Sequence, residues 1–209
     1  FARTGGEANA IAVRIARAAA GKDNVAICGY HGWHDWYLAV NINSKDGLDS
    51  HLLPGLEAQG VPKGLGGTVF PFHYNNFLEL EKIVNENNIG VIKMEVVRND
   101  GPEDNFLQSV RDLATKKGIV LIFDECTSGF RETNGGIYQK YNVEPDIAMY
   151  GKALGNGYAI TAIVGKKEVM ESAQNTFISS TFWTERIGPS AALKTLEVME
   201  RIKSWDQIS

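Results

Sequence analysis

The sequence is poor in cysteine, has no excess of basic charge and contains no long hydrophobic run. Only Cys28 and Cys126 occur in its 209 residues, too few for the disulfide framework of a small secreted protein. Its 21 basic side chains are outnumbered by 25 acidic ones, for a net charge of −4, which argues against nucleic acid as a partner. No apolar stretch is long enough to span a bilayer. We therefore expect a cytoplasmic protein with no membrane partner, which binds small molecules or other protein subunits.

The composition is that of a folded globular protein. Hydrophobic residues make up 44% of the chain and charged residues 22%, close to ordinary usage, which disfavours disordered and low-complexity classes. No internal repeat or linker divides the chain, so we expect one domain over residues 1–209. The chain opens at Phe1 and runs directly into Ala2-Arg3-Thr4-Gly5-Gly6-Glu7, a pattern typical of a strand that leads into a helix. We expect this domain to be a piece of a longer protein.

Helical and strand patterns alternate along the chain. Apolar residues at helical spacing predict helices over residues 7–20, 77–87, 103–117 and 187–202. Short apolar, β-prone runs predict strands over residues 25–28, 68–70, 90–96, 119–123, 146–150 and 160–164. This alternation predicts an α/β fold, in which a mostly parallel sheet is covered by helices on both faces. Residues 29–67 are rich in proline and glycine and predict a long irregular stretch, of a kind that is usually functional or mobile.

Lys152 and Asp124 each follow a predicted strand. Lys152 lies in the glycine-rich turn 151–157 and Asp124 directly follows residue 123, so both should lie at the carboxyl edge of the sheet, where open α/β sheets bind ligands. A phosphate-binding P-loop is excluded, because its spacing requires a glycine where the sequence has Asp146. Two alternatives stay open: Lys152 as a solvated surface lysine, and Asp124 as a helix cap or rim carboxylate. Together the two charges could anchor a ligand with a basic ring nitrogen.

Two further segments could bind a ligand at the same edge. Thr4, Gly5 and Gly6 begin a helix whose backbone N–H groups could hold an anion, and Thr4 as an ordinary N-cap is the alternative. Segment 29–34 places Tyr30 after a strand and beside a glycine, which would let the backbone approach a flat ligand while the ring stacks on it. An aromatic packing cluster is the alternative for this segment.

The same segment raises the question of a metal site. His31, His34 and Asp35 lie close together in the sequence. No cysteine or glutamate completes a convincing ligand set with them. We expect no metal.

Five short motifs occur in order along the chain. They are Thr4-Gly5-Gly6-Glu7-Ala8, Tyr30-His31-Gly32, Asp124-Glu125, Gly129-Phe130-Arg131 and Tyr150-Gly151-Lys152-Ala153-Leu154-Gly155-Asn156-Gly157. Together they resemble the class III aminotransferases, which are pyridoxal phosphate (PLP) enzymes of fold type I. Within that class the chain is most similar to the glutamate-1-semialdehyde aminomutase group, from Gly5 to about Thr195. The resemblance implies the large PLP-binding domain, with a mostly parallel, seven-stranded-type sheet sandwiched by helices, and an N-terminal segment and a small C-terminal domain outside this chain.

The resemblance assigns roles to residues of these motifs. It implies that Lys152 joins PLP as a Schiff base and that Asp124 pairs with the pyridinium nitrogen, which makes the ring a better electron sink. Gly5 and Gly6 would offer backbone N–H groups to the cofactor phosphate. Three further residues are implied to bind the cofactor: Tyr30 on one face of the ring, Cys126 against the other, and His31 in the motif with Tyr30.

The resemblance also implies a homodimer. Thr181 looks like the threonine that reaches the phosphate bound by a neighbouring subunit, and Glu95 matches a glutamate at a strand end. Two positions depart from the family pattern. Thr4-Gly5-Gly6 stands where the family has Ser-Gly-Thr, which removes one hydroxyl near the phosphate, and Cys126 replaces a valine. Neither departure changes the expected class.

Amino-group transfer is the activity that the resemblance implies. An incoming amine would displace Lys152 from PLP, and the freed lysine would move a proton between the substrate carbon and the cofactor, with a pyridoxamine form as intermediate. The partners would be a small-molecule amino donor and a carbonyl acceptor, in an aminotransferase or an aminomutase. A PLP-dependent decarboxylase or racemase would share Lys152 and Asp124. A non-catalytic PLP-fold segment that acts in assembly is a third hypothesis.

Overall fold

A single sheet forms the centre of the chain in the computed structural model, which describes residues 1–208. Its six strands lie in the order β2-β1-β3-β4-β5-β6. Their bounds are Asn24–Cys28 for β1, Val69–Pro71 for β2, Ile89–Glu95 for β3, Val120–Glu125 for β4, Ile147–Tyr150 for β5 and Ala162–Gly165 for β6. The first five strands are parallel, and β6 pairs antiparallel with β5. The predicted mostly parallel sheet is therefore confirmed.

The expectation of seven strands is wrong for the described residues, which form six. Near the chain start, Ala2 makes one isolated antiparallel bridge to Thr161, immediately before β6. The backbone then enters the first helix at Gly5. One bridge with no neighbouring pair does not make a strand, because a ladder needs successive paired residues.

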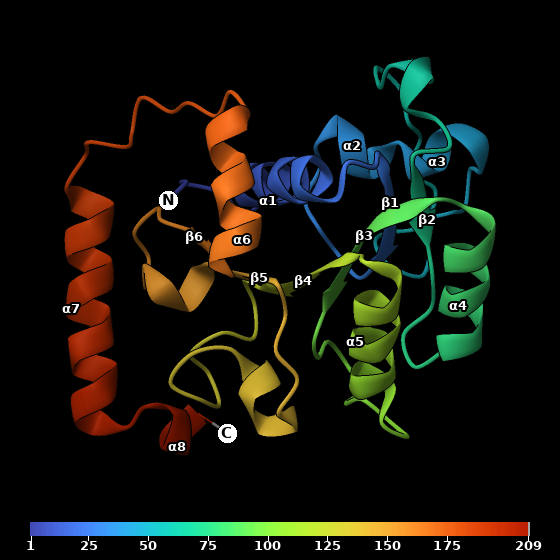
Figure 1. Cartoon of the computed structure of the whole chain (residues 1–209). Coiled ribbons are helices and arrows are strands. Elements are labelled where there is room, and N and C mark those ends of the chain that lie inside the picture. The colour runs from blue at the N-terminus through green and yellow to red at the C-terminus, as the bar shows by residue number, and fades with distance from the viewer. Residues whose placement is uncertain (209) are drawn as a thin grey trace.

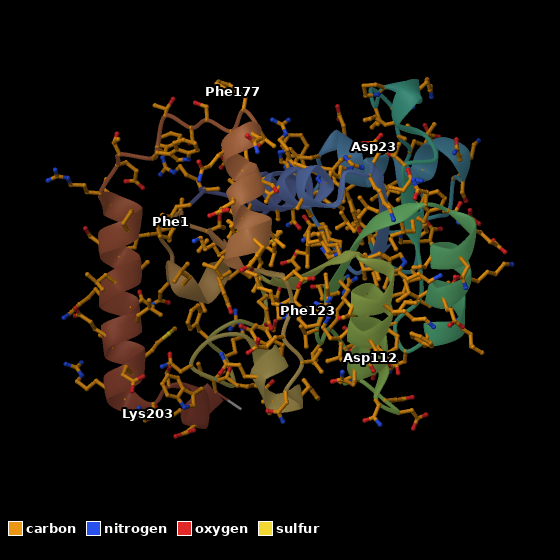
Figure 2. All side chains as sticks on the ribbon, in the orientation of Figure 1. Phe1, Asp23, Asp112, Phe123, Phe177 and Lys203 are labelled. Atoms are coloured by element: carbon orange, nitrogen blue, oxygen red, sulfur yellow. The ribbon has the colours of Figure 1, made fainter. Side chains whose placement is uncertain are left out.

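Helices cover both faces of the sheet (Figure 1). On one face lies α1 (Gly5–Ala20), which packs with Val91, Ile122 and Met149. On the other face lie α4 (Phe77–Glu86) and α5 (Phe106–Lys117). They pack with the strand side chains that point to this face, among them Phe123. Figure 2 shows Phe123 in the interior of the molecule. Because successive strand residues point to opposite faces, β3 and β4 contribute to both apolar clusters, which is why these strands are continuous apolar runs.

Local sequence explains where the helices begin and end. Thr4 caps α1 by accepting a hydrogen bond from the backbone N–H of Glu7 at 3.2 Å, and Gly21 ends the helix with φ of 62°. The helix therefore begins at Gly5, two residues before the predicted start. The predicted helix over residues 103–117 begins later than expected, at Phe106 of α5, because the preceding Asp104 and Asn105 both have positive φ and lie outside the helix.

The remaining helical segments are short, apart from α7. The stretch predicted to be irregular contains α2 (Asp35–Leu38), α3 (Val40–Asn43) and the 3-10 turn η1 (Lys63–Leu65). Further along are η2 (Ile137–Tyr141), η3 (Lys152–Leu154), α6 (Lys167–Met170), η4 (Glu171–Asn175), α7 (Ile187–Ile202) and α8 (Trp205–Ile208). Figure 1 shows α7 at the outer side of the molecule, beyond β6.

Residues 1–208 contain neither a membrane-spanning helix nor a cluster of metal ligands. None of their helices combines the length and the apolar character needed to cross a membrane. In the same residues, no group of three or more histidine, cysteine, aspartate and glutamate side chains is arranged to hold a metal ion.

Candidate active site

A cavity of about 390 Å³ lies at the carboxyl edge of the sheet. The parallel register aligns Glu95 at the end of β3 with Asp124 of β4, and Asp124 with Met149 of β5. Residues after these strands and the start of α1 complete the wall. The lining consists of Thr4, Gly5, Gly6, Asn9, Tyr30, Gly32, Trp33, Glu95, Asp124, Cys126, Thr127, Gly151, Lys152 and Thr161. The expected meeting of Lys152 and Asp124 at one sheet edge is thus observed.

Lys152 enters this cavity from a strained backbone position. It follows β5 and opens the 3-10 turn η3 with φ of 31°, in a region that residues other than glycine rarely adopt. Its Nζ donates a hydrogen bond to Thr127 Oγ1 at 2.9 Å. Such strained residues gather at functional sites, where the surrounding structure holds them in place. Lys152 is an exposed residue whose amine lines the cavity and is oriented by Thr127.

Asp124 is a buried carboxylate that lines the cavity. Only 4% of the residue is exposed. Its Oδ2 accepts a hydrogen bond from His31 Nδ1 at 2.9 Å, and its Oδ1 accepts one from the backbone N–H of Cys126 at 3.1 Å. Burial favours the neutral acid, but the Lys93 ammonium and the His31 hydrogen bond outweigh it, so the pKa of Asp124 lies below its usual range.

The first turn of α1 forms a cradle of glycines. A Cβ added to Gly6 would lie 2.7 Å from His34 Cε1, and one added to Gly32, where φ is 93°, would lie 2.9 Å from the Gly6 Cα. Real Cβ atoms do not approach other atoms so closely, so the loop and the helix start can meet only through glycine. The first N–H groups of a helix have no partner within the helix, which makes this turn suited to an anion.

The other predicted cofactor-binding residues divide into two groups. Tyr30 and Cys126 line the cavity as expected, and the backbone N–H of Tyr30 donates to Glu95 Oε2 at 3.0 Å. His31 does not line it, because its ring is wholly buried between Asp124 and the Cys28 carbonyl. Thr181 is exposed and also lies outside the lining. For Thr181, the role towards a second subunit stays a prediction.

Comparison with known families decides the classification. Residues 1–209 match the family "Aminotransferase class-III". The chain belongs to this family. The resemblance of its five motifs to class III aminotransferases is thereby confirmed.

Curated class III relatives include both aminotransferases and aminomutases. The chain is 38% identical over 216 residues to the 3-aminobutyryl-CoA aminotransferase of Cloacimonas acidaminovorans, covering 99% of this chain and 48% of the relative. It is 34% identical over 211 residues to the glutamate-1-semialdehyde 2,1-aminomutase of Methanococcus maripaludis, covering 96% and 48%. The chain therefore spans about half the length of the curated relatives it matches.

Solved structures of transaminases share the fold. The ornithine aminotransferase of Toxoplasma gondii superposes with a TM-score of 0.81 at 24% identity, covering 98% of this chain and 49% of that one. A structure described as a transaminase with PLP bound superposes with a TM-score of 0.80 at 25% identity, covering 94% and 48%. These likenesses show that the six-stranded sheet has the fold of these transaminases.

The sequence prediction missed three residues that line the cavity, Asn9, Thr127 and Thr161. It also missed Lys93, which pairs with Asp124. Asn9 and Lys93 carried a signal, because each is a polar residue inside an apolar pattern, one on the inner face of α1 and one within β3. Buried Asn9 Oδ1 has no hydrogen-bond partner. Thr127 and Thr161 lie in connections, where no residue pattern distinguishes them.

Proposed function

We propose that this chain binds PLP through Lys152 and carries out amino-group transfer between a small-molecule amino donor and a carbonyl acceptor. The observation that carries the proposal is that Lys152, Asp124 and the first turn of α1 line one cavity. Membership of the class III aminotransferase family supports the same activity.

The residues of the cavity fit the chemical groups of PLP. A lysine amine suits its aldehyde, an ionised aspartate suits its basic ring nitrogen, and a glycine-lined helix start suits its phosphate. The close contact between Gly6 and Gly32 is the cradle that an added Cβ would fill. The unpartnered Asn9 Oδ1 is a buried acceptor at the same wall.

Each of these residues has a task in the proposed reaction. When bound, PLP supplies an electron sink that stabilises the charge left after a proton is removed from the substrate carbon. Lys152 Nζ holds the cofactor and, once released, takes and returns that proton as general base and acid. Thr127 Oγ1 orients this amine. Asp124 holds a proton on the ring nitrogen, and Tyr30 stacks on the ring.

We propose that residues 1–209 are the cofactor-binding large domain of a longer enzyme. The supporting observation is that the chain covers 48% of the first curated relatives. We also propose a cytoplasmic location, since both cysteines are free, as in reducing compartments.

A homodimer in which Thr181 contacts the partner's cofactor phosphate is part of the proposal. The segment around Thr181 exposes large apolar side chains, with Phe177 86% and Trp183 54% exposed. Figure 2 shows Phe177 at the outer edge of the molecule. Exposed apolar patches often mark protein interfaces. Sedimentation velocity on the PLP-loaded protein would contradict this part of the proposal if it gave only monomer.

Conversion of bound PLP to its pyridoxamine form tests the proposed activity. The PLP-loaded protein is mixed with a panel of amino acids and amines, and the visible band of the lysine-bound cofactor is followed. We expect one or more donors to remove the band and a carbonyl acceptor to restore it. Lys152→Ala should lack the lysine-linked band and show no transfer.

Two outcomes would contradict the proposal. A protein that gains no visible band with PLP is not a PLP enzyme, which would favour a role in assembly. Release of carbon dioxide without formation of the pyridoxamine form would instead assign a decarboxylase. The choice of donor and acceptor then identifies the substrate class.

A further inference from the structure

Lys93 is a wholly buried lysine in the middle of the sheet. Its exposure is 0%. It lies on β3 between Val91 and Glu95, on the face that packs against α1. Lysine is almost never fully buried unless a carboxylate compensates its charge. The proposed transfer chemistry assigns no task to this amine.

The compensating carboxylate is Asp124. Lys93 Nζ lies 3.7 Å from Asp124 Oδ2 and donates a hydrogen bond to Met149 Sδ at 3.1 Å. Since Asp124 is paired in register with Met149, the lysine side chain reaches from β3 across to this row of β4 and β5. In the described part of the chain, Asp124 is the one carboxylate that forms an ion pair with Lys93.

Asp124 therefore faces two nitrogen groups that compete for one negative charge. His31 Nδ1 contacts the same Oδ2, and His31 Nε2 lies 3.1 Å from the Cys28 carbonyl oxygen. Both partners of this imidazole are acceptors, so only a protonated ring could donate to both. Burial lowers the pKa of both groups, His31 and Lys93; the Lys93 ammonium lowers that of His31 further, whereas the charges of Asp124 and Glu95 raise that of Lys93. With the His31 ring neutral, Lys93 is the partner that can place a positive charge beside Asp124, at 3.7 Å.

The groups around the pair include few cations. The titratable groups that face it are His31 after β1, Glu95 on β3, Cys126 after β4 and Lys152 after β5. The buried residues of α1, which packs over β3 and β4, are Ala8, Asn9, Ala12, Val13, Ile15 and Ala16, and none is charged. Among these groups, Lys93 contributes the positive charge inside the sheet.

We propose that the buried Lys93 ammonium is a positioning residue that neutralises Asp124 and thereby weakens the hold of Asp124 on the proton of the cofactor's ring nitrogen. A lone buried carboxylate attracts a pyridinium with its full negative charge. A carboxylate that already shares its charge with an ammonium attracts it less, and the ammonium also repels the pyridinium directly. The inference rests on the proposed PLP function. Pairing of Asp124 with Lys93 leaves the cofactor ring a weaker electron sink than an unpaired aspartate would.

The test uses PLP labelled with ¹⁵N at the ring nitrogen. The nitrogen chemical shift of the loaded protein is followed against pH in the wild type and in Lys93→Met, an unbranched side chain one atom shorter that carries no charge. Removing the ammonium should raise the pH at which the ring nitrogen loses its proton by about one unit or more, which is a tenfold change in proton affinity. Lys93→Arg, which keeps the charge, should restore values near the wild type.

Lys166→Met is the matched control. It removes another lysine–carboxylate pair, in which Lys166 Nζ lies 2.8 Å from Asp146 Oδ1, and neither residue lines the cavity. We expect the same nitrogen titration as in the wild type. A structural effect of losing any ion pair would appear in both variants, whereas an effect through Asp124 appears only in Lys93→Met.

The outcomes separate this inference from the proposed function. If the wild type shows no lysine-bound visible band, both are wrong. If the band forms but Lys93→Met titrates like the wild type, the inference about Lys93 alone is wrong. Should Lys93→Met fail to fold, Lys93→Gln takes its place: loss of the ring-nitrogen proton at a higher pH than in the wild type supports the inference, and a titration like that of the wild type contradicts it.

Discussion

Gly32 is the single residue on which the shape of the glycine cradle depends most directly. Its φ of 93° is unfavourable for any side chain, and an added Cβ would lie 2.9 Å from the backbone Cα of Gly6. Backbone cannot rotate away as a side-chain tip can, so the start of α1 would have to move. The backbone N–H groups proposed to hold the cofactor phosphate would move with it.

We therefore expect Gly32→Ala to weaken PLP binding about tenfold or more and to lower the free energy of unfolding by about 1–3 kcal/mol. Gly21→Ala is the matched control, because Gly21 also has positive φ, at 62°, but an added Cβ there has no atom within 4 Å. The control should cost about 1 kcal/mol and leave PLP affinity unchanged. Fluorescence titration with PLP and urea unfolding measure both quantities. Wild-type affinity in Gly32→Ala would contradict the cradle.

Asp146 joins several elements at the start of β5. Its Oδ2 accepts hydrogen bonds from the backbone N–H of Leu121 in β4 and from Arg111 Nη1 in α5, both at 2.9 Å, and Lys166 Nζ after β6 donates to its Oδ1 at 2.8 Å. Burial raises the pKa of this carboxyl, but these three partners together hold it below its usual range. One carboxylate thus ties two strands and a helix together.

Because its folded pKa is lowered, Asp146 stabilises the fold above its unfolded pKa of about 4, and this contribution is lost as pH falls through the folded value. We expect Asp146→Asn to lower the free energy of unfolding by about 2 kcal/mol at neutral pH. Its unfolding free energy should also fall less steeply below about pH 4 than that of the wild type. Urea unfolding over a pH series measures this. Asp112→Asn, at an exposed position, is the control, and its free energy of unfolding should depend on pH as in the wild type. If Asp146→Asn also behaved like the wild type, Asp146 would not stabilise the fold in this way.

At the scale of the elements, the sequence predicted which segments are helices and strands better than where they begin. Hydrophobic periodicity located α1, but its start was placed two residues late, because the capping geometry of Thr4 decides it. The carboxyl edge was predictable, since Lys152 and Asp124 each follow a parallel strand. The contact between Lys93 and Asp124 was not predictable, because the pairing of a buried amine with a carboxylate on the next strand depends on the register of the two strands. The sequence also could not show that His31 lies outside the cavity, because its contact with Asp124 depends on how β1 and β4 are placed in the sheet.

At the scale of the whole molecule, the site is assembled from distant parts of the chain. The start of α1, the ends of β3, β4 and β5, and Thr161 before β6 all contribute to one cavity. The bridge between Ala2 and Thr161 holds the beginning of the chain beside this last segment. Loss of any one of these elements would therefore open the cavity. This explains why cofactor binding is expected to depend on the fold as a unit.

Attachment of the cofactor to Lys152 is the basis of the proposed function. It is tested most directly by reducing the PLP-loaded protein with sodium borohydride, digesting it and locating the phosphopyridoxyl group by mass spectrometry. We expect the label on Lys152 and none on Lys93, the buried lysine that pairs with Asp124. A label on a different lysine, or no label at all, would contradict it.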